Sequence, residues 1–220
     1  MSVGPSLTTG YLLDLVLPLE CGGCGVPSTR WCANCAAALR VQPDEPRLVA
    51  PRIDPGVPVF ALGRYAGARS RAILALKEHG RRDLTAPLAR TLALGIDRLM
   101  TWGMADTPLT VVPAPTRRWA ARRRGGDPVT RLAAAAIRQH PEITVVPALR
   151  TTGMVRDSVG LTSAARERNI TGRVRLIRPV RGEVLLVDDI VTTGATACEA
   201  VRVLHAAGAR VIGVLTVAHA

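Results

Sequence analysis

The sequence predicts an α/β protein whose core is a doubly wound, mostly parallel sheet, preceded by a small cysteine-rich module. From residue 109 onward, short apolar runs that favour strands alternate with segments of helical periodicity. Four of the five cysteines fall within residues 21–35. We therefore expect two units, the module over residues 1–45 and the α/β domain over residues 46–220.

Composition limits the classes of function. A chain of 220 residues with 48% apolar content can bury a sizeable core and is not a disordered tail. The net charge of +12 at pH 7 favours anionic partners such as nucleotides, other phosphorylated small molecules or nucleic acid. Aromatic residues make up only 3% of the chain, which argues against a stacking platform for single-stranded nucleic acid.

Neither a secretion signal nor a membrane span is expected. Residues 12–19 are apolar but short, include Asp14 and lack a basic leader, so we interpret them as a segment that docks on the main core. No run approaches the roughly 18 apolar residues that a membrane span needs. We expect a cytoplasmic protein, in which thiols stay reduced.

The clustered cysteines form two CxxC pairs with seven residues between them. Two such pairs supply the four thiolates that a tetrahedral Zn²⁺ requires, and four ligands leave no open position for catalysis. A redox dithiol and a pair of small disulfides are the alternatives. The predicted structural zinc ligands are Cys21, Cys24, Cys32 and Cys35.

Between the module and residue 109, the pattern predicts one short strand and two helices. Residues 41–58 are rich in proline and indicate a linker or an irregular cover. A strand is expected over 60–65, and a helix over 68–79 that is closed by Gly80. Apolar residues at helical spacing over 84–99 predict a core helix.

Lys77 stands out because it is the single lysine among 29 basic residues. In a chain that otherwise uses arginine, a lone lysine can mark a place that needs a compact ammonium group. A solvated position on the helix is the alternative.

A strand over residues 109–113 runs into a basic loop. Asp127 and Pro128 suit the cap and first turn of the helix that follows, so the loop joins a strand to a helix. The basic residues therefore form either an anion site at the carboxyl end of the sheet or a solvated face. The loop begins with Ala114, Pro115 and Thr116 and continues with Arg117, Arg118, Arg122, Arg123 and Arg124.

A further strand is expected over 144–146, and little apolar periodicity follows over 150–172. A loop of that length inside a domain is usually functional or mobile. Strands over 174–177 and 211–217 complete the alternation. The arginines that recur in the long segment are Arg150, Arg156, Arg166 and Arg168.

The most informative stretch is 184–196, which reads as a buried strand, two carboxylates, and a loop of threonine, glycine and alanine before a helix over 197–207. Open α/β sheets place ligands at the carboxyl ends of their strands. Small residues admit an anion close to backbone N–H groups, and the helix N-terminus adds partial positive charge. This loop is therefore a predicted phosphate site, formed by Thr192, Thr193, Gly194, Ala195 and Thr196.

The adjacent carboxylates of Asp188 and Asp189 suit the diol of a ribose or a Mg²⁺ ion. Carboxylates beside a phosphate loop indicate a phosphorylated sugar. The alternative is a structural capping box, in which Thr196 caps the helix and Glu199 reaches back to it.

Residues 184–196 resemble the 13-residue signature of type I phosphoribosyltransferases, which bind 5-phosphoribosyl-1-pyrophosphate (PRPP). The order of the whole chain is similar to that of the ComF family of phosphoribosyltransferase-like proteins, members of which are linked to the uptake of transforming DNA. The features that carry this resemblance are the apolar leader, the double CxxC, the helix with Lys77, Val112-Pro113-Ala114-Pro115, Arg150, Leu161, Arg166, Asn169 and the PRPP motif.

The resemblance implies a role for each of these segments. Asp188 and Asp189 would hold the ribose hydroxyls, and residues 192–196 the 5-phosphate. The pyrophosphate loop would comprise Ala114, Pro115, Thr116, Arg117 and Arg118, and residues 151–171, with Arg150 and Arg166, would form the flexible loop that closes over PRPP.

Two functions follow from different classes. The first is an enzyme that binds PRPP with Mg²⁺ and transfers the phosphoribosyl group to a nitrogenous acceptor, with Arg117 stabilising the pyrophosphate that leaves. The second is a non-catalytic protein of the same fold that binds single-stranded DNA or a DNA-uptake helicase. A homodimer is compatible with either.

Overall fold

The computed structural model of the protein describes residues 19–116, 126–152 and 172–220. Several residues of the sequence analysis lie outside these ranges, and so does most of the segment 151–171. The residues outside the described ranges are Asp14, Arg117, Arg118, Arg122, Arg123, Arg124, Arg156, Leu161, Arg166, Arg168 and Asn169.

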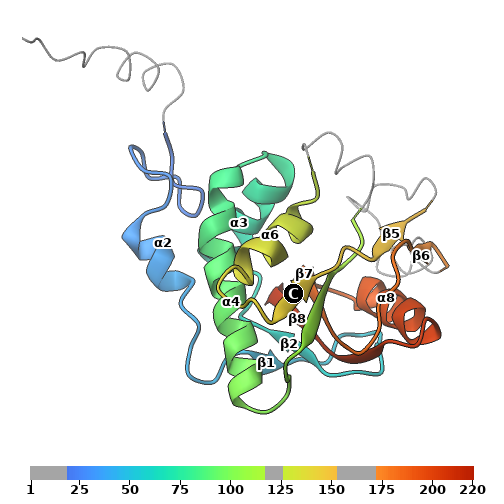
Figure 1. Ribbon diagram of the computed structural model, residues 1–220. Helices are drawn as coiled ribbons and strands as arrows, with labels where there is room; N and C mark the ends of the chain where they lie inside the picture. Colours follow the sequence, from blue (N-terminus) through green and yellow to red (C-terminus); the bar gives the residue numbers. More distant parts are fainter. Residues whose placement is uncertain (1–18, 117–125, 153–171) are drawn as a thin grey trace, which may run out of the picture.

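A mostly parallel sheet of six strands forms the centre of the domain (Figure 1). Its spatial order is β1-β2-β8-β7-β3-β4, and every neighbouring pair is parallel except β1 with β2. The predicted fold class is therefore confirmed, with an antiparallel edge strand added. In chain order the strands are β1 (Arg47–Leu48), β2 (Val59–Ala61), β3 (Leu109–Pro113), β4 (Ile143–Val145), β7 (Glu183–Val191) and β8 (Arg210–His219).

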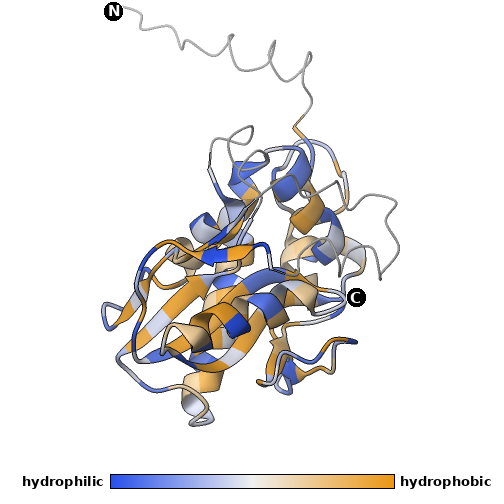
Figure 2. Ribbon diagram, turned by 90° about the vertical axis from the view of Figure 1, so that its right-hand side faces the viewer, coloured by the Kyte–Doolittle hydropathy of each residue, from blue (hydrophilic) through white to orange (hydrophobic). Residues whose placement is uncertain are grey.

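Apolar side chains cover both faces of this sheet. Successive residues of the central strands point to opposite faces, and both faces are buried by other elements. Leu185 and Val187 of β7 pack with the helices on one face, and Val184 and Leu186 pack with α8 on the other. Figure 2 shows the resulting hydrophobic strands. The first face carries α3 (Gly67–Glu78), η1 (Arg82–Leu84), α4 (Thr85–Thr101) and α6 (Pro128–Ala136); the second carries α8 (Ala195–Ala206) and a hairpin of β5 (Leu149–Thr151) and β6 (Val174–Leu176).

Several local expectations are confirmed. Gly80 follows α3 with a φ of +65°, in the left-handed region that favours glycine. Asp127 caps α6 by accepting hydrogen bonds from the Val129 N–H at 3.0 Å and the Thr130 hydroxyl at 2.6 Å, with Pro128 in the first turn. These short-range signals act within one or two turns and need no tertiary context.

Other expectations need correction. Residues 174–176 pair antiparallel with β5 in a separate hairpin, so this strand is not part of the parallel sheet, and residues 150–151 belong to β5 rather than to a loop. The strand expected over 60–65 is shorter, ending at Ala61, and β7 extends through the acidic pair to Val191. None of the described helices is both long and apolar enough to cross a bilayer.

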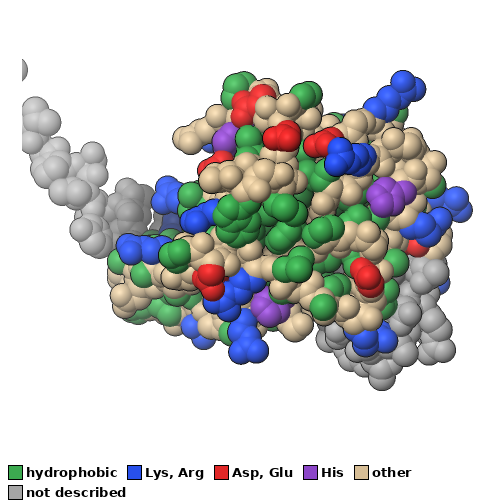
Figure 3. Space-filling model, turned by 90° about the horizontal axis from the view of Figure 1, so that it is seen from below, with side chains coloured by type: hydrophobic (Ala, Val, Ile, Leu, Met, Phe, Trp, Pro, Cys, Tyr) green, Lys and Arg blue, Asp and Glu red, His purple; other side chains and the backbone are tan. Residues whose placement is uncertain are grey.

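The end of the sheet away from the acidic pair, where α4 ends and β3 begins, is the face that Figure 3 shows. Apolar side chains gather near its centre, with charged ones scattered around them. Trp102 and Met104, which follow α4, are exposed.

Candidate functional site

The predicted phosphate loop joins β7 to α8. Gly194 is the N-cap of α8, with a φ of +86°, and no side chain caps the helix. The N–H groups of the first turn therefore lack intrahelical acceptors, although the Ala195 N–H donates to the Thr193 hydroxyl oxygen at 3.4 Å. This end of the helix can bind an anion. The capping-box alternative is wrong, because Glu199 instead accepts a hydrogen bond from the Gly172 N–H and pairs with Arg202.

The loop and one of the two carboxylates line the same small pocket, which is open to solvent. Asp188 lies on its wall, and Thr216 of β8 lies opposite Asp188 in the strand register. The sequence-predicted residues that the structure brings together here are Asp188, Thr192, Thr193, Gly194, Ala195 and Thr196.

A segment of the proline-rich region covers the outer side of this loop. The Ile53 N–H donates to the Thr193 carbonyl oxygen at 2.8 Å. A Cβ at Gly194 would lie 2.3 Å from the Ile53 carbonyl oxygen and 2.9 Å from the Pro51 Cβ. Of the two roles that the sequence left open for residues 41–58, the cover is therefore the one the structure shows at Pro51–Ile53, and Gly194 is needed for this close approach.

The two carboxylates point to opposite faces of the sheet, because successive side chains of a strand alternate. Asp188 is half-buried and opens to the pocket. Asp189 is only 3% exposed and lies on the side of α3. There the Lys77 Nζ lies 2.8 Å from Asp189 Oδ1 and 2.7 Å from Asp189 Oδ2, so the solvated alternative for Lys77 is wrong.

The local charges shift the pKa values in this group. Burial and the adjacent charge of Asp189 raise the pKa of Asp188 well above its ordinary value, although Lys77 opposes this. Burial acts to lower the pKa of Lys77, but the charges of Asp189 and Asp188 outweigh it and raise that pKa. The lysine thus stays charged, while Asp188 gives up its proton less readily than an isolated carboxyl group.

The start of the predicted pyrophosphate loop lies beside β7. The Ala114 N–H donates to the Val187 carbonyl oxygen at 2.8 Å, one residue before the acidic pair. Ala114 and Pro115 are buried and Thr116 is half-buried. Arg150 lies on the β5–β6 hairpin and is not among the residues that line the pocket.

The four predicted zinc ligands form a second cluster. Their Sγ atoms all lie within 4.8 Å of one another, so this group could hold a structural metal ion. The Cys32 N–H donates to Cys21 Sγ at 3.3 Å, and the Cys35 N–H donates to Cys32 Sγ at 3.4 Å. Such N–H groups stabilise thiolates, which are the metal-binding form of cysteine.

The cysteine pKa values fit a metal site. Burial acts to raise the pKa of Cys21, but backbone hydrogen bonds, first from Cys32, lower it to about 6. Burial and the neighbouring thiols raise the pKa of Cys35 far above its ordinary value. Four thiolates this close repel one another, and a bound dication would allow Cys35 to ionise with the rest.

Two arginines attach the cysteine loops to α3 and η1. The Arg71 guanidinium donates to the carbonyl oxygen of Gly23, which lies between two of the cysteines. Arg81 donates to the Glu20 carbonyl oxygen at 3.0 Å and approaches the Arg30 carbonyl oxygen at 3.4 Å. The helix that carries Lys77 is thereby held against the cysteine cluster.

Sequence comparison finds several relatives that share the name DNA utilization protein YhgH. The DNA utilization protein YhgH of Escherichia coli (strain K12) is 28% identical over 204 residues, which cover 88% of this chain and 81% of that protein. The protein of the same name from Salmonella typhimurium (strain LT2) is 24% identical over 215 residues, with the same coverage. The comparison confirms the ComF resemblance.

Two further similarities have less coverage. A ribose-phosphate pyrophosphokinase of Rhodopirellula baltica is 28% identical over 182 residues, or 76% of this chain and 53% of that protein. The solved structure of Leishmania donovani UMP synthase aligns with a TM-score of 0.34 and 14% identity, covering 68% of this chain and 24% of that one. No family model matches the chain.

Proposed function

We propose that the protein binds PRPP with Mg²⁺ and transfers its phosphoribosyl group to a nitrogenous acceptor, releasing pyrophosphate. The observation that carries this proposal is the pocket in which Asp188 and the uncapped N-terminus of α8 lie together. An anion-binding helix end beside a carboxylate matches a ligand that carries both a phosphate and a diol.

In this proposal the 5-phosphate accepts hydrogen bonds from residues 192–196 at the start of α8. The ribose hydroxyls donate to Asp188, the member of the acidic pair that opens to the pocket. Mg²⁺ would arrive with the pyrophosphate, where it neutralises charge. The phosphate oxygens of the ligand are suitable ligands for it.

The pyrophosphate end of the ligand would extend from this pocket toward Ala114, which is hydrogen-bonded to β7 just before the acidic pair. Arg117 and Arg118 follow in the chain, and we propose that they hold the pyrophosphate as it leaves. Arg150 and Arg166 would act with the flexible loop over residues 151–171, which closes over the ligand and excludes water.

We assign a structural Zn²⁺ to the cysteine cluster, because four sulfur ligands leave no open position for a substrate. The module over 1–45 then stabilises α3 from outside the domain over 46–220. A zinc site of four thiolates fits the reducing cytoplasm that we propose for this protein.

Calorimetry with PRPP and Mg²⁺ tests the ligand. We expect binding by the wild type, weakened at least about ten-fold by Asp188→Asn, which keeps the shape of the side chain but removes its charge. Asp106→Asn is the matched control, since Asp106 is exposed, does not line the pocket and changes the net charge by the same amount in the same direction. Equal affinity in the wild type and Asp188→Asn would contradict the proposal.

Turnover is tested separately, by the release of pyrophosphate from PRPP across a panel of nucleobases and other amines. An enzyme releases pyrophosphate only when the correct acceptor is present, and Asp188→Asn abolishes that release. PRPP binding without release for any acceptor would leave the protein in the class of binding proteins.

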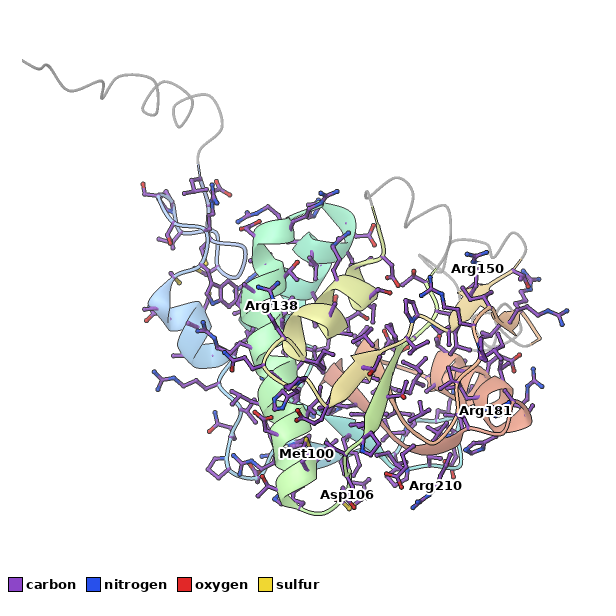
Figure 4. All side chains as sticks on the ribbon, in the orientation of Figure 1. Met100, Asp106, Arg138, Arg150, Arg181 and Arg210 are labelled. Atoms are coloured by element: carbon purple, nitrogen blue, oxygen red, sulfur yellow. The ribbon has the colours of Figure 1, made fainter. Side chains whose placement is uncertain are left out.

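A second function, binding of single-stranded DNA, is favoured by the β5–β6 hairpin. Arg150 and Arg175 are directly opposite each other in this hairpin, and like charges so placed destabilise a strand pair unless an anion lies between them. Arg178 and Arg181 follow β6 and are exposed, and Figure 4 shows Arg150 and Arg181 on the same side of the molecule. The relatives' name, DNA utilization protein, is compatible with this function.

Salt dependence tests this second function. Affinity for single-stranded DNA should fall steeply as salt rises, because phosphate contacts release counterions. Changing Arg150 and Arg175 together to alanine should flatten that dependence. The pair Arg90 and Arg138, both exposed on the other face of the sheet, is the control of equal charge. Identical salt slopes for the two double variants would exclude the hairpin as the DNA site.

A further inference from the structure

Asp188 and Asp189 lie on opposite faces of the sheet, and the chain's single lysine lies on the face away from the pocket. Lys77 is in the last turn of α3, 112 positions before Asp189 in the sequence. Its Nζ reaches both oxygens of that carboxylate, at 2.8 Å and 2.7 Å. The side chains of Lys77 and Asp189 are 29% and 4% exposed, so the pair is largely withdrawn from water.

Hydrogen bonds from neighbouring arginines fix the position of α3 and therefore of the Lys77 ammonium. Arg69, on the same helix, is buried and donates to the Val217 carbonyl oxygen of β8 at 3.0 Å, while its guanidinium packs on Gly63. Arg71 and Arg81 attach the two ends of the helix region to the cysteine loops. Lys77 therefore projects from an anchored helix toward the sheet.

We propose that Lys77 is a positioning residue, whose ammonium holds Asp189 on the α3 side and balances its charge so that Asp188 alone presents a carboxylate to the ligand. This inference rests on the proposed function of the pocket. It assigns different roles to two adjacent residues of identical chemistry, one in contact with the ligand and one supporting it from behind.

The physical reason is the proximity of two negative charges in a poorly solvated place. Without Lys77, the buried carboxylate of Asp189 would lose its counter-ion, and the pair would take up a proton more readily. Among the residues that the structure describes, the charged and titratable groups that act on Lys77 are Asp188 and Asp189 on β7 and Tyr65 just before α3. An ammonium suits this position because one compact nitrogen can reach both carboxylate oxygens.

The first test needs no ligand. Because Lys77 is the only lysine, selective ¹³C and ¹⁵N lysine labelling gives a single side-chain signal whose titration reports this ion pair. The pKa of Lys77 should fall in Asp189→Asn by about one unit or more, because burial then acts without its nearest compensating charge. It should stay unchanged in Arg90→Met. An equal Lys77 titration in the wild type and Asp189→Asn would overturn the inference.

The second test measures PRPP affinity against pH. Lys77→Met should move the midpoint of binding upward by about one pH unit, since Asp188 must lose its proton next to an unbalanced Asp189. Lys77→Arg should keep the midpoint of the wild type. A loss of affinity by the same factor at every pH would indicate a merely structural role and overturn the inference.

A double variant completes the design and guards against misfolding of Lys77→Met. Lys77→Met combined with Asp189→Asn should return the midpoint toward the wild-type value, because the unbalanced charge is gone. A midpoint that stays raised in the double variant would contradict the proposal that Lys77 balances the charge of Asp189. If the wild type binds no PRPP, the proposed function fails, while the lysine titration still decides whether Lys77 fixes Asp189.

Discussion

The change Gly194→Ala tests the close approach of the covering segment to the phosphate loop. Alanine at a φ of +86° is strained by about 1–2 kcal/mol. Its Cβ would also lie 2.3 Å from the Ile53 carbonyl oxygen, so Pro51–Ile53 must move. That movement loses the hydrogen bond from the Ile53 N–H to Thr193, about 1 kcal/mol. The expected loss of unfolding free energy is about 2–3 kcal/mol.

Gly208→Ala separates the two contributions. Gly208 follows α8 with nearly the same φ, +83°, and a Cβ there meets nothing within 4 Å. This variant should lose only the backbone strain, about 1–2 kcal/mol. Urea unfolding of the two variants therefore gives the cost of displacing the cover as a difference of about 1 kcal/mol.

Hydrogen exchange at a single amide adds a local measurement. The Ile53 N–H should exchange faster in Gly194→Ala and at the wild-type rate in Gly208→Ala, because only the first change displaces its acceptor. Equal stability of the two variants, with Ile53 equally protected in both, would refute the reasoning that Gly194 is required by the covering segment.

Two further predictions concern the metal site and the carboxyl group of Asp188. Cys24→Ser should lose the one zinc ion expected per chain and loosen the cysteine loops, while urea unfolding of the sheet persists; wild-type protein that contains no zinc when purified without chelators would remove this claim. Asp188→Asn should be more stable than the wild type by a margin that grows as the pH rises above 3.8. A raised folded-state pKa means that the native state binds the extra proton, so wild-type stability falls with pH. Urea unfolding at several pH values checks this, and a variant less stable at every pH would contradict it.

The parts of the fold that the sequence predicted are those set by short-range patterns. The stretch 184–196 predicted a strand, an acidic pair, a loop and a helix, because each is encoded by adjacent residues. Asp127 predicted its cap in the same way. The two cysteine pairs predicted a cluster whose sulfur atoms do lie together.

Features that depend on distant contacts could not be predicted. β1 and β5 have two and three residues, too few to show a periodicity. Lys77 and Asp189 meet only because α3 packs on β7, so composition singled out the lysine but not its partner. The opposite orientations of Asp188 and Asp189 followed from strand alternation, once β7 was known to extend through both.

The central claim is that a phosphorylated ribose binds where α8 begins, with Asp188 beside it. The most direct measurement is a titration of ¹⁵N-labelled protein with PRPP and Mg²⁺, followed through the backbone amides of residues 193–197. We predict that these amides shift first and most, that ribose 5-phosphate shifts the same amides, and that inorganic phosphate does so only weakly. Saturating PRPP that leaves these amides unmoved would contradict the claim.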